Sequence, residues 1–463
     1  MYTNFLNNIF SKTPLWLIMN RKYLALFIVM TLFAGLSSEA QKVRFSKYFN
    51  DETLCVYYYR TGNRQHDTIE ISYFESYPRN LFSKNVWAGS RTQLLDPFDN
   101  GDYRVVVRDA KSGRDLYSRG YNTLFREYRD TEAGRDSVAE FQEVVRLPMP
   151  KKDVDILFEE RGEDHRYHTQ YTYRYKPEVE RQAEREKIFL SSYLPPYYEP
   201  LKLHYNGDVH KKIDVVIVPE GYGPADSAKM CRDMRTFCDY MLAQEPFRSR
   251  AKDFNVWGIP RMGLDSGITD PGKGIAVQSL VGSSYNTFGI DRYLMTMNLF
   301  KLHNVIGFTP CDHIIIMANS TTYGGGAIYN FYAMSSLTEY ASYVLPHELG
   351  HSIGGLADEY VDEDISYSDL HAPTFEPTEP NITTLFAFDQ KWQALLPAGT
   401  PIPTPYDPEA PRYENGPLGV YEGAGYKSKG VYRPVMHCMM RDYAPFCPVC
   451  TQRLNEVFDL YVR

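Results

Sequence analysis

The chain has 463 residues, enough for two or three domains that each bury their own core. Acidic and basic residues are mixed along it, and the formal net charge is −8 at pH 7. A nucleic-acid-binding protein needs a clustered basic surface, which this composition does not suggest. We therefore expect no nucleic-acid partner and no strong field that draws the protein to anionic membranes.

Residues 1–40 have the pattern of a targeting segment. Arg21 and Lys22 precede an apolar run from Tyr23 to Leu36, and Ser38-Glu39-Ala40 has the small-x-small form of a cleavage site. The apolar run is short for a membrane span. The pattern predicts a signal peptide and a secreted, periplasmic or cell-surface protein with no stable membrane insertion after cleavage. A permanent signal anchor is the alternative.

Residues 41–175 are predicted to form an all-β, sandwich-like domain. Short runs rich in β-branched and aromatic residues are separated by turn signals such as Asp99-Asn100-Gly101. Strands at this spacing favour a β-sandwich. Residues 176–200, which are charge-dense and then contain prolines, are predicted to be a linker that begins with a short solvated helix. The predicted strands are Thr53–Tyr59, Thr68–Phe74, Tyr103–Arg108 and Asp153–Phe158.

Residues 201–463 are predicted to form an α/β domain, because apolar runs of buried-strand type alternate with helical patterns. After residue 360 the chain is acidic and then rich in proline up to about residue 411, so we expect a long, mostly irregular segment there. The predicted strands are Ile213–Val218, Phe254–Ile259 and His313–Ala318, and the predicted helices are Ala225–Gln244, Arg292–Leu302 and Thr451–Leu460.

The stretch from residue 345 to 360 carries the clearest chemical pattern. His347 and His351 are four residues apart, so on a helix they share one face and their imidazoles can converge on one metal ion. Glu348 projects toward the same place, where it can take a proton from a metal-bound water. Pro346 suits the first turn of such a helix, and Gly354-Gly355 can end it. A chance HExxH on an ordinary amphipathic helix is the alternative.

A catalytic zinc site needs a third protein ligand and one open position for water. A chain that turns sharply at the glycine pair can bring Asp358 back toward the metal, so Asp358 is the predicted third ligand and Glu359 the second choice. His371 lies twenty residues beyond His351, where another class of zinc peptidase keeps its third ligand. Ala372-Pro373-Thr374 is poor helix material, so His371 ranks below Asp358.

The run HELGHSIGGLADEY, together with FCPVC near the C-terminus, resembles the IgA-peptidase-type family of bacterial zinc metallopeptidases. The GGLADEY continuation is the more specific part, since HExxH occurs in many zinc peptidases. The resemblance implies a Zn²⁺ cofactor and a zincin-like, metzincin-type α/β catalytic domain after a β-rich N-terminal domain. It also implies a methionine turn beneath the metal, which Met439 or Met440 fits. Where the commonest metzincin pattern has a third histidine, this sequence has Ala357.

Gly324, Gly325 and Gly326 precede the histidine motif by some twenty residues. Glycines let a peptide backbone approach closely, so an edge strand here could bind an extended substrate by β-augmentation. A plain glycine-rich loop is the alternative.

The sequence contains seven cysteines, so at least one is unpaired within the chain. Cys447-Pro-Val-Cys450 fits a redox dithiol, half of a zinc site or a local disulfide, and only His437 and Cys438 are near enough in sequence to complete a zinc site. For an exported protein we expect a structural disulfide near the cleft. Buried free thiols are the alternative.

Together these features predict a secreted zinc endopeptidase. Its partner would be a protein or peptide substrate, with immunoglobulin or another extracellular protein suggested by the family resemblance. Two alternatives remain: a non-catalytic binding or adhesion protein with a relic zinc site, and a zinc amide hydrolase that acts on glycan or cell wall.

Overall fold

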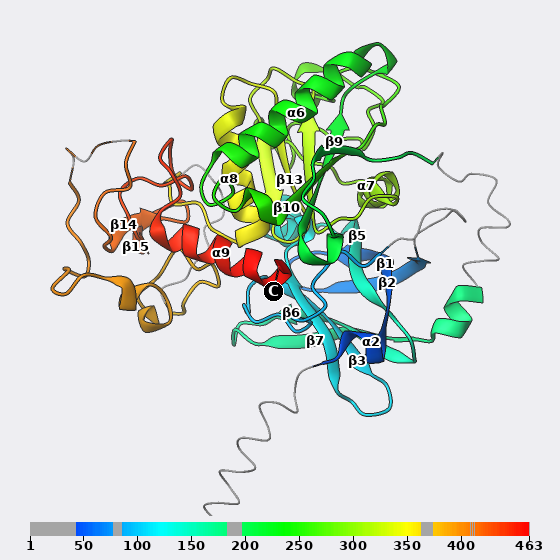
Figure 1. Cartoon of the computed structure of the whole chain (residues 1–463). Helices are drawn as coiled ribbons and strands as arrows, with labels where there is room; N and C mark the ends of the chain where they lie inside the picture. Colours follow the sequence, from blue (N-terminus) through cyan, green and yellow to red (C-terminus); the bar gives the residue numbers. More distant parts are fainter. Residues whose placement is uncertain are drawn as a thin grey trace, which may run out of the picture. The chain divides into compact units, whose positions relative to one another are not determined.

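The N-terminal part of the chain is built from two antiparallel sheets (Figure 1). The computed structural model describes residues 43–76, 86–182, 197–362, 374–407, 409, 411 and 413–462. The first sheet has the order β2-β1-β5 and the second β4-β3-β6-β7. Their strands are β1 (Phe49–Gly62), β2 (Asp67–Ser76), β3 (Tyr103–Asp109), β4 (Asp115–Tyr121), β5 (Ala139–Pro150), β6 (Val154–Arg161) and β7 (Tyr167–Tyr175).

Aromatic side chains join these two sheets. The Tyr58 ring meets Phe158 edge-on at 4.8 Å, and its hydroxyl lies 3.0 Å from that of Tyr121. On the other face of β1, Tyr57 contacts Phe300 of the C-terminal part at 5.2 Å. Strand β1 is therefore buried on both faces, which explains its nearly continuous apolar run. Three short helices accompany the sheets: α2 (Phe45–Tyr48), α3 (Leu124–Asp130) and α4 (Glu132–Asp136).

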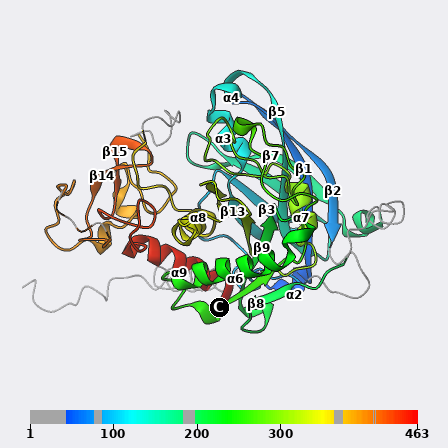
Figure 2. The same cartoon turned by 90° about the horizontal axis from the view of Figure 1, so that it is seen from above.

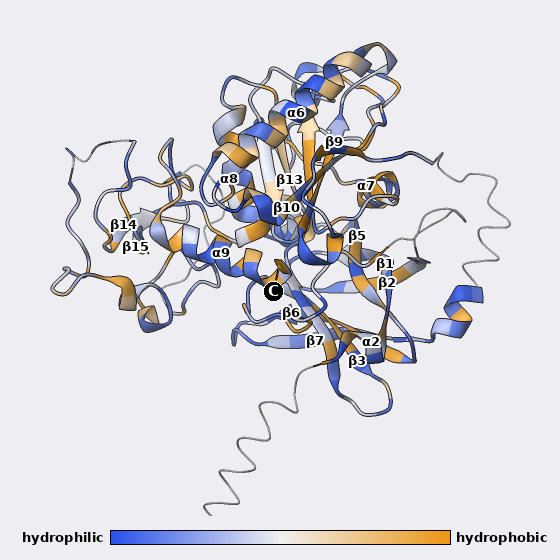
Figure 3. Cartoon of the chain, viewed as in Figure 1, coloured by the Kyte–Doolittle hydropathy of each residue, from blue (hydrophilic) through white to orange (hydrophobic). Residues whose placement is uncertain are grey.

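A six-stranded mixed sheet forms the centre of the C-terminal part, with the order β12-β13-β11-β9-β10-β8. The four inner strands are parallel and the two edge strands are antiparallel to their neighbours. The inner strands are fully buried, and Figure 3 shows them largely in the colour of hydrophobic residues. The strands are β8 (Leu201–His204), β9 (Ile213–Glu220), β10 (Phe254–Gly258), β11 (His313–Ala318), β12 (Gly325–Ile328) and β13 (Tyr332–Ser336).

Helices cover both faces of this sheet. Helix α6 (Ser227–Ala243) buries the predicted stripe of Met230, Met234, Phe237 and Met241. Figures 1 and 2 place α8 (Ala341–Gly354) and α7 (Leu299–Ile306) on opposite sides of the strands. The observed architecture is thus a β-rich N-terminal part followed by a mixed α/β part, as the sequence predicts.

The predicted helix Arg292–Leu302 is wrong over its first half. Helix α7 begins only at Leu299. The preceding residues are extended, because Tyr293 forms a bridge with Gly325 and Met295 forms one with Ser284. The pairing of the backbone with the sheet therefore overrides the local helical spacing.

The chain ends with a hairpin and a helix. The hairpin pairs β14 (Tyr421–Ala424) with β15 (Lys427–Arg433), within a mostly irregular region, and α9 (Pro448–Val462) follows. Short 3-10 helices cover Val209–Lys211, Pro224–Asp226, Ala251–Asp253, Pro271–Lys273, Phe388–Gln390 and Gln393–Leu395.

Residues 45–463 belong to one unit, in which the β-rich and α/β parts share hydrogen bonds. The amide of Asn122 donates to the Tyr329 carbonyl (3.0 Å), and Asn330 Nδ2 donates to the Gly120 carbonyl (2.7 Å). These bonds hold the end of β4 against the residues that directly follow β12.

The predicted targeting segment, residues 1–40, lies outside the described residues. Within the described part of the chain, no helix is long and apolar enough to cross a membrane. Of the predicted 176–200 linker, residues 177–182 are helical, and residues 183–196 lie outside the description.

Candidate metal centre

The HExxH motif lies on α8, which packs against β12 and β13. The helix begins at Ala341, so Pro346 lies inside it and not in its first turn, and that prediction is wrong. The helix begins before the proline because Ala341, Val344 and Leu345 are buried in its first turns. Their packing outweighs the backbone hydrogen bond that Pro346, which has no N–H, cannot make. The helix ends as predicted: Gly355 takes the left-handed conformation, with φ of 59°.

The structure brings His347, His351 and Asp358 together. The Nε2 atoms of the two histidines are 3.1 Å apart, and Asp358 Oδ1 lies 3.0 Å from the first and 3.3 Å from the second. Asp358 is only 6% exposed, and its Oδ1 has no hydrogen-bond partner. Three potential ligand atoms therefore face one small space.

Backbone carbonyls determine which nitrogen of each histidine faces that space. Nδ1 of His347 bonds to the Met439 carbonyl at 2.8 Å, and Nδ1 of His351 bonds to the Leu356 carbonyl at 2.6 Å. A carbonyl can only accept, so each Nδ1 carries hydrogen, and each neutral ring turns the lone pair of Nε2 toward Asp358. Lone pairs at these separations repel unless a proton or a metal ion lies between them. The three residues therefore fit a metal ion.

The charges of the three groups are strongly linked. Burial lowers the pKa of His351, but the Asp358 carboxylate outweighs this effect and raises that pKa to about 9. The same opposing influences leave the pKa of His347 raised. Burial raises the pKa of Asp358, but the two histidines bring it well below its usual range. Without a metal the cluster holds protons, which metal binding would displace.

Tyr426 supports the aspartate from the turn between β14 and β15. Its hydroxyl donates to Asp358 Oδ2, and the amide of Gly425 donates to the Asp358 carbonyl at 2.9 Å. Oδ1 is thereby left directed at the histidines. Sequence reasoning missed Tyr426, which lies 68 residues from Asp358 in a region without a recognisable motif.

Glu348 lies in the same cleft, beside the glycine-rich edge strand. Burial raises the pKa of its carboxyl, while the two histidines act in the opposite direction. A Cβ on Gly325 would lie 3.0 Å from Glu348 Oε1, so the glycine leaves room for this carboxylate. Gly325 and Gly326 belong to β12, and Gly324 precedes it. The bridge from Gly325 to Tyr293 already covers part of this edge.

The two candidate methionines differ in what they contact. Met439 contributes its carbonyl, which accepts from His347 and, at 3.0 Å, from the Tyr343 hydroxyl. Met440 is fully buried, and its sulfur lies only 2.4 Å from the position that a Cβ on Gly350 would take. Met440 thus lies against α8, and Gly350 makes that approach possible.

Glu359 points away from the histidines. Its Oε1 accepts from Asn381 Nδ2 at 2.9 Å and from Cys450 Sγ at 3.4 Å. Neighbouring residues of an extended segment face opposite sides, so Asp358 and Glu359 cannot both reach the same cluster. The structure places Asp358, the first choice, beside the histidines. His371 lies outside the described residues.

The cleft at this centre has a volume of about 670 Å³ and receives residues from both parts of the chain. Helix α3 contributes Glu127, whose Oε2 accepts from the Tyr293 hydroxyl at 2.6 Å and whose pKa is raised by burial to about 7. The C-terminal side contributes Tyr443, which is 53% exposed. Other lining residues from the N-terminal part are Asn100, Asp102, Asn122, Arg126, Asp130, Arg161 and His165.

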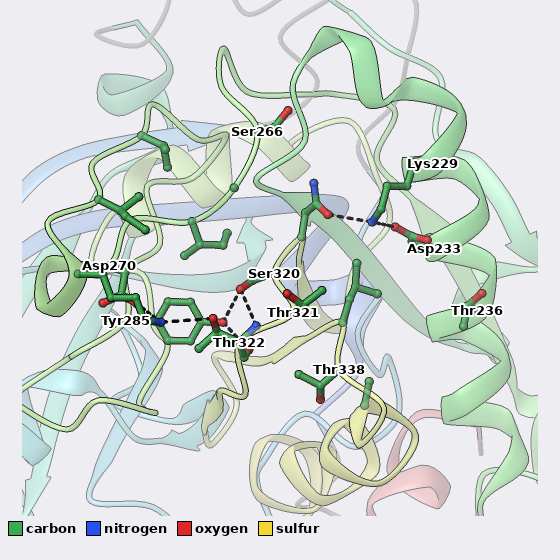
Figure 4. Close-up of a pocket in the computed structure, with 18 of the residues that line it drawn as sticks. Lys229, Asp233, Thr236, Ser266, Asp270, Tyr285, Ser320, Thr321, Thr322 and Thr338 are labelled. Atoms are coloured by element: carbon green, nitrogen blue, oxygen red, sulfur yellow. Dashed lines mark hydrogen bonds and ion pairs between the residues drawn. The ribbon is translucent and has the colours of Figure 1, made fainter.

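A second cavity, also of about 670 Å³, lies beside α6 and contains none of these residues (Figure 4). Lys229 there bonds to Asp233 at 2.6 Å and to Asn319 at 2.8 Å. The ammonium group of Lys229 is thus already paired within this cavity, which contains no residue of the HExxH motif.

Cys438, Cys447 and Cys450 form no disulfide in the structure, so the expected structural disulfide near the cleft is wrong. The sulfurs of Cys438 and Cys450 are 3.8 Å apart. A disulfide requires about 2.05 Å.

Comparison with known families gives two matches. The family model described as IgA Peptidase M64 matches residues 201–416 and 409–458. A second, described as Peptidase M64 N-terminus, matches residues 44–172. No curated protein matches the chain significantly. The first match includes the helix with both histidines, the aspartate and the C-terminal cysteines.

Proposed function

The chain belongs to the IgA Peptidase M64 family and is a metallopeptidase. We propose further that it is a secreted zinc endopeptidase with a zincin-like catalytic domain. One observation carries the proposal: His347, His351 and Asp358 direct three ligand atoms into one buried space. Two imidazoles and one carboxylate, with a further position open to the cleft, are a donor set typical of catalytic zinc.

A bound zinc ion supplies Lewis acidity, which polarises a peptide carbonyl and acidifies a water molecule. The protein supplies the remaining chemistry. Glu348 accepts the proton from the attacking water and delivers it to the leaving amine. Its position next to Gly325 keeps the carboxylate at the cleft, and the hydrogen bonds from Nδ1 keep both imidazoles oriented.

The substrate proposed for this cleft is an extended segment of an extracellular protein. Strand β12 forms one edge of the main sheet and borders the cleft, so it can pair with a peptide backbone beyond the bridge at Gly325. The residues that α3 and its neighbouring loops contribute would contact the substrate's side chains. Export is supported by the charged start, apolar run and small-residue site within residues 1–40.

The test is chelation followed by metal addition, with a mixed peptide library as substrate. The proposal expects cleavage to disappear with chelator and to return best with zinc, and His347→Ala to abolish that recovery. Cleavage that persists in fully demetallated protein would overturn the proposed zinc dependence. Cleavage of small acyl-amide or glycan substrates alone would replace the endopeptidase with an amide hydrolase. No turnover on any substrate would indicate a binding protein.

A further inference from the structure

We propose that Glu359, Cys438, Cys447 and Cys450, here named the cysteine–glutamate cluster, bind a second, structural metal ion, most suitably Zn²⁺. One ligand atom from each residue lies within 4.8 Å of all the others, and all four side chains are completely buried. The cluster is separate from the histidine site, and the inference does not depend on the peptidase proposal.

The spacing of the ligand atoms agrees with tetrahedral coordination. Zn–S bonds of about 2.3 Å in a tetrahedron place two sulfurs about 3.8 Å apart. Cys438 Sγ and Cys450 Sγ are separated by 3.8 Å. A sulfur and a carboxylate oxygen on the same ion would be about 3.5 Å apart, and Cys450 Sγ lies 3.4 Å from Glu359 Oε1.

An unsatisfied oxygen points independently to a missing partner. Glu359 Oε2 is buried and has no hydrogen-bond partner, although Oε1 accepts from Asn381. A buried carboxylate oxygen left unpaired is costly, and a cation bound to this carboxylate close to both of its oxygens would remove that cost. Two backbone amides also donate to the sulfurs: Cys447 N–H to Cys438 Sγ at 3.3 Å and Cys450 N–H to Cys447 Sγ at 3.5 Å. Such bonds favour thiolates.

The surrounding charges complete the case for a divalent ion. Three thiolates and one carboxylate carry four negative charges, so a divalent ion leaves two to be balanced. Arg433 is only 2% exposed and interacts electrostatically with the Glu359 carboxyl. Arg441 Nη1 donates to the Glu359 carbonyl at 3.1 Å. The soft sulfur ligands and the closed, buried geometry favour zinc over magnesium or calcium.

A metal ion at this position would also stabilise the histidine site, because residues of the two sites are neighbours in the chain. Glu359 directly follows Asp358, and its amide donates to the Met440 carbonyl at 2.8 Å. Cys438 directly precedes Met439, whose carbonyl accepts from His347. The ion would therefore hold three segments together. These are the loop that carries Asp358, the segment around Met439 that orients His347, and the start of α9.

The experiment counts metal in the full chain after the histidine site has been disabled. In the His347→Ala/His351→Ala protein, elemental analysis should still find about one zinc per chain. X-ray absorption should show about three sulfurs at ~2.3 Å. Adding Cys450→Ser should remove this zinc. Adding Cys238→Ser, a matched change of a buried cysteine on α6, should leave it in place.

Several results would overturn the proposal. One is a metal-free double-histidine protein. Another is a peptide map that links any two of the three C-terminal cysteines by a disulfide. Absorption data without sulfur around the remaining zinc would also contradict it. If the Cys450→Ser protein fails to fold, the absorption spectrum of the double-histidine protein alone decides. Because that protein lacks the proposed catalytic ligands, loss of peptidase activity does not affect the result.

Discussion

Tyr426→Phe should weaken metal binding at the histidine site without disturbing the fold. The hydroxyl of Tyr426 donates to Oδ2 of Asp358, a carboxylate that is only 6% exposed. Hydrogen bonds to charged groups contribute about 1.5–3 kcal/mol. Loss of such an outer partner typically weakens metal affinity about 10–100-fold, and tenfold corresponds to about 1.4 kcal/mol. We therefore expect a loss of ~10–100-fold in zinc affinity.

The assay is a competition titration with a chelator of known affinity, together with peptide cleavage at saturating zinc. Tyr421→Phe is the matched control. It lies in the same hairpin and is buried, but its hydroxyl bonds to the Pro417 carbonyl at 3.1 Å and not to the site. Unchanged zinc affinity in Tyr426→Phe, or an equal loss in Tyr421→Phe, would refute the supporting role assigned to Tyr426.

Three further outcomes follow from the structure. Asp358→Asn should retain the fold, as judged by circular dichroism, but lose most of its zinc and cleavage activity; normal zinc content would exclude Asp358 as a ligand. Gly325→Ala should lower kcat about 10–100-fold, because the new methyl group would lie 3.0 Å from Glu348 Oε1, from the Met334 carbonyl oxygen and from Val344 Cγ1, and the Glu348 carboxylate, at the end of a flexible side chain, is the group that can move; a normal kcat would show that the carboxylate does not need this space. Burial, together with the neighbouring Asp312, raises the pKa of Asp214 from 3.8 to about 8. The folded state therefore holds a proton that the unfolded state releases, and stability should fall as pH rises between about 4 and 8. Burial also raises the pKa of Asp312, to about 7, so Asp214→Asn alone should make that part of the urea-unfolding profile shallower and Asp214→Asn/Asp312→Asn should flatten it. An unchanged slope in the double variant would place the titration elsewhere.

The sequence predicted features that depend on nearby residues. The histidine pair and Glu348 need only helical periodicity, and the turn that returns Asp358 needs only the glycine pair. Apolar runs likewise predicted three of the four inner strands of the main sheet, β9, β10 and β11, whereas the short strand β13 was not predicted. Each of these patterns is contained within about ten residues, so one segment is enough to reveal it.

The features that were missed depend on contacts distant in sequence. Tyr426 reaches Asp358 across 68 residues. Glu127 reaches the cleft from the N-terminal part, which carried no sign of a site. Tyr293 and Met295 form β-bridges with Gly325 and Ser284, so residues 292–298 are not helical although their spacing favours a helix. Glu359 was the second choice as a ligand of the histidine site. The sequence could not show that its side chain instead faces three cysteines.

The central claim is that Glu348 moves protons at a metal held by His347, His351 and Asp358. Its most direct test is a peptide-library digest with wild-type protein and Glu348→Gln, each containing the same measured amount of zinc. The amide keeps nearly the same shape but cannot act as a base, so cleavage should fall by about 10²–10⁴-fold while zinc content stays unchanged. Equal cleavage by the two proteins at equal zinc content would contradict the account.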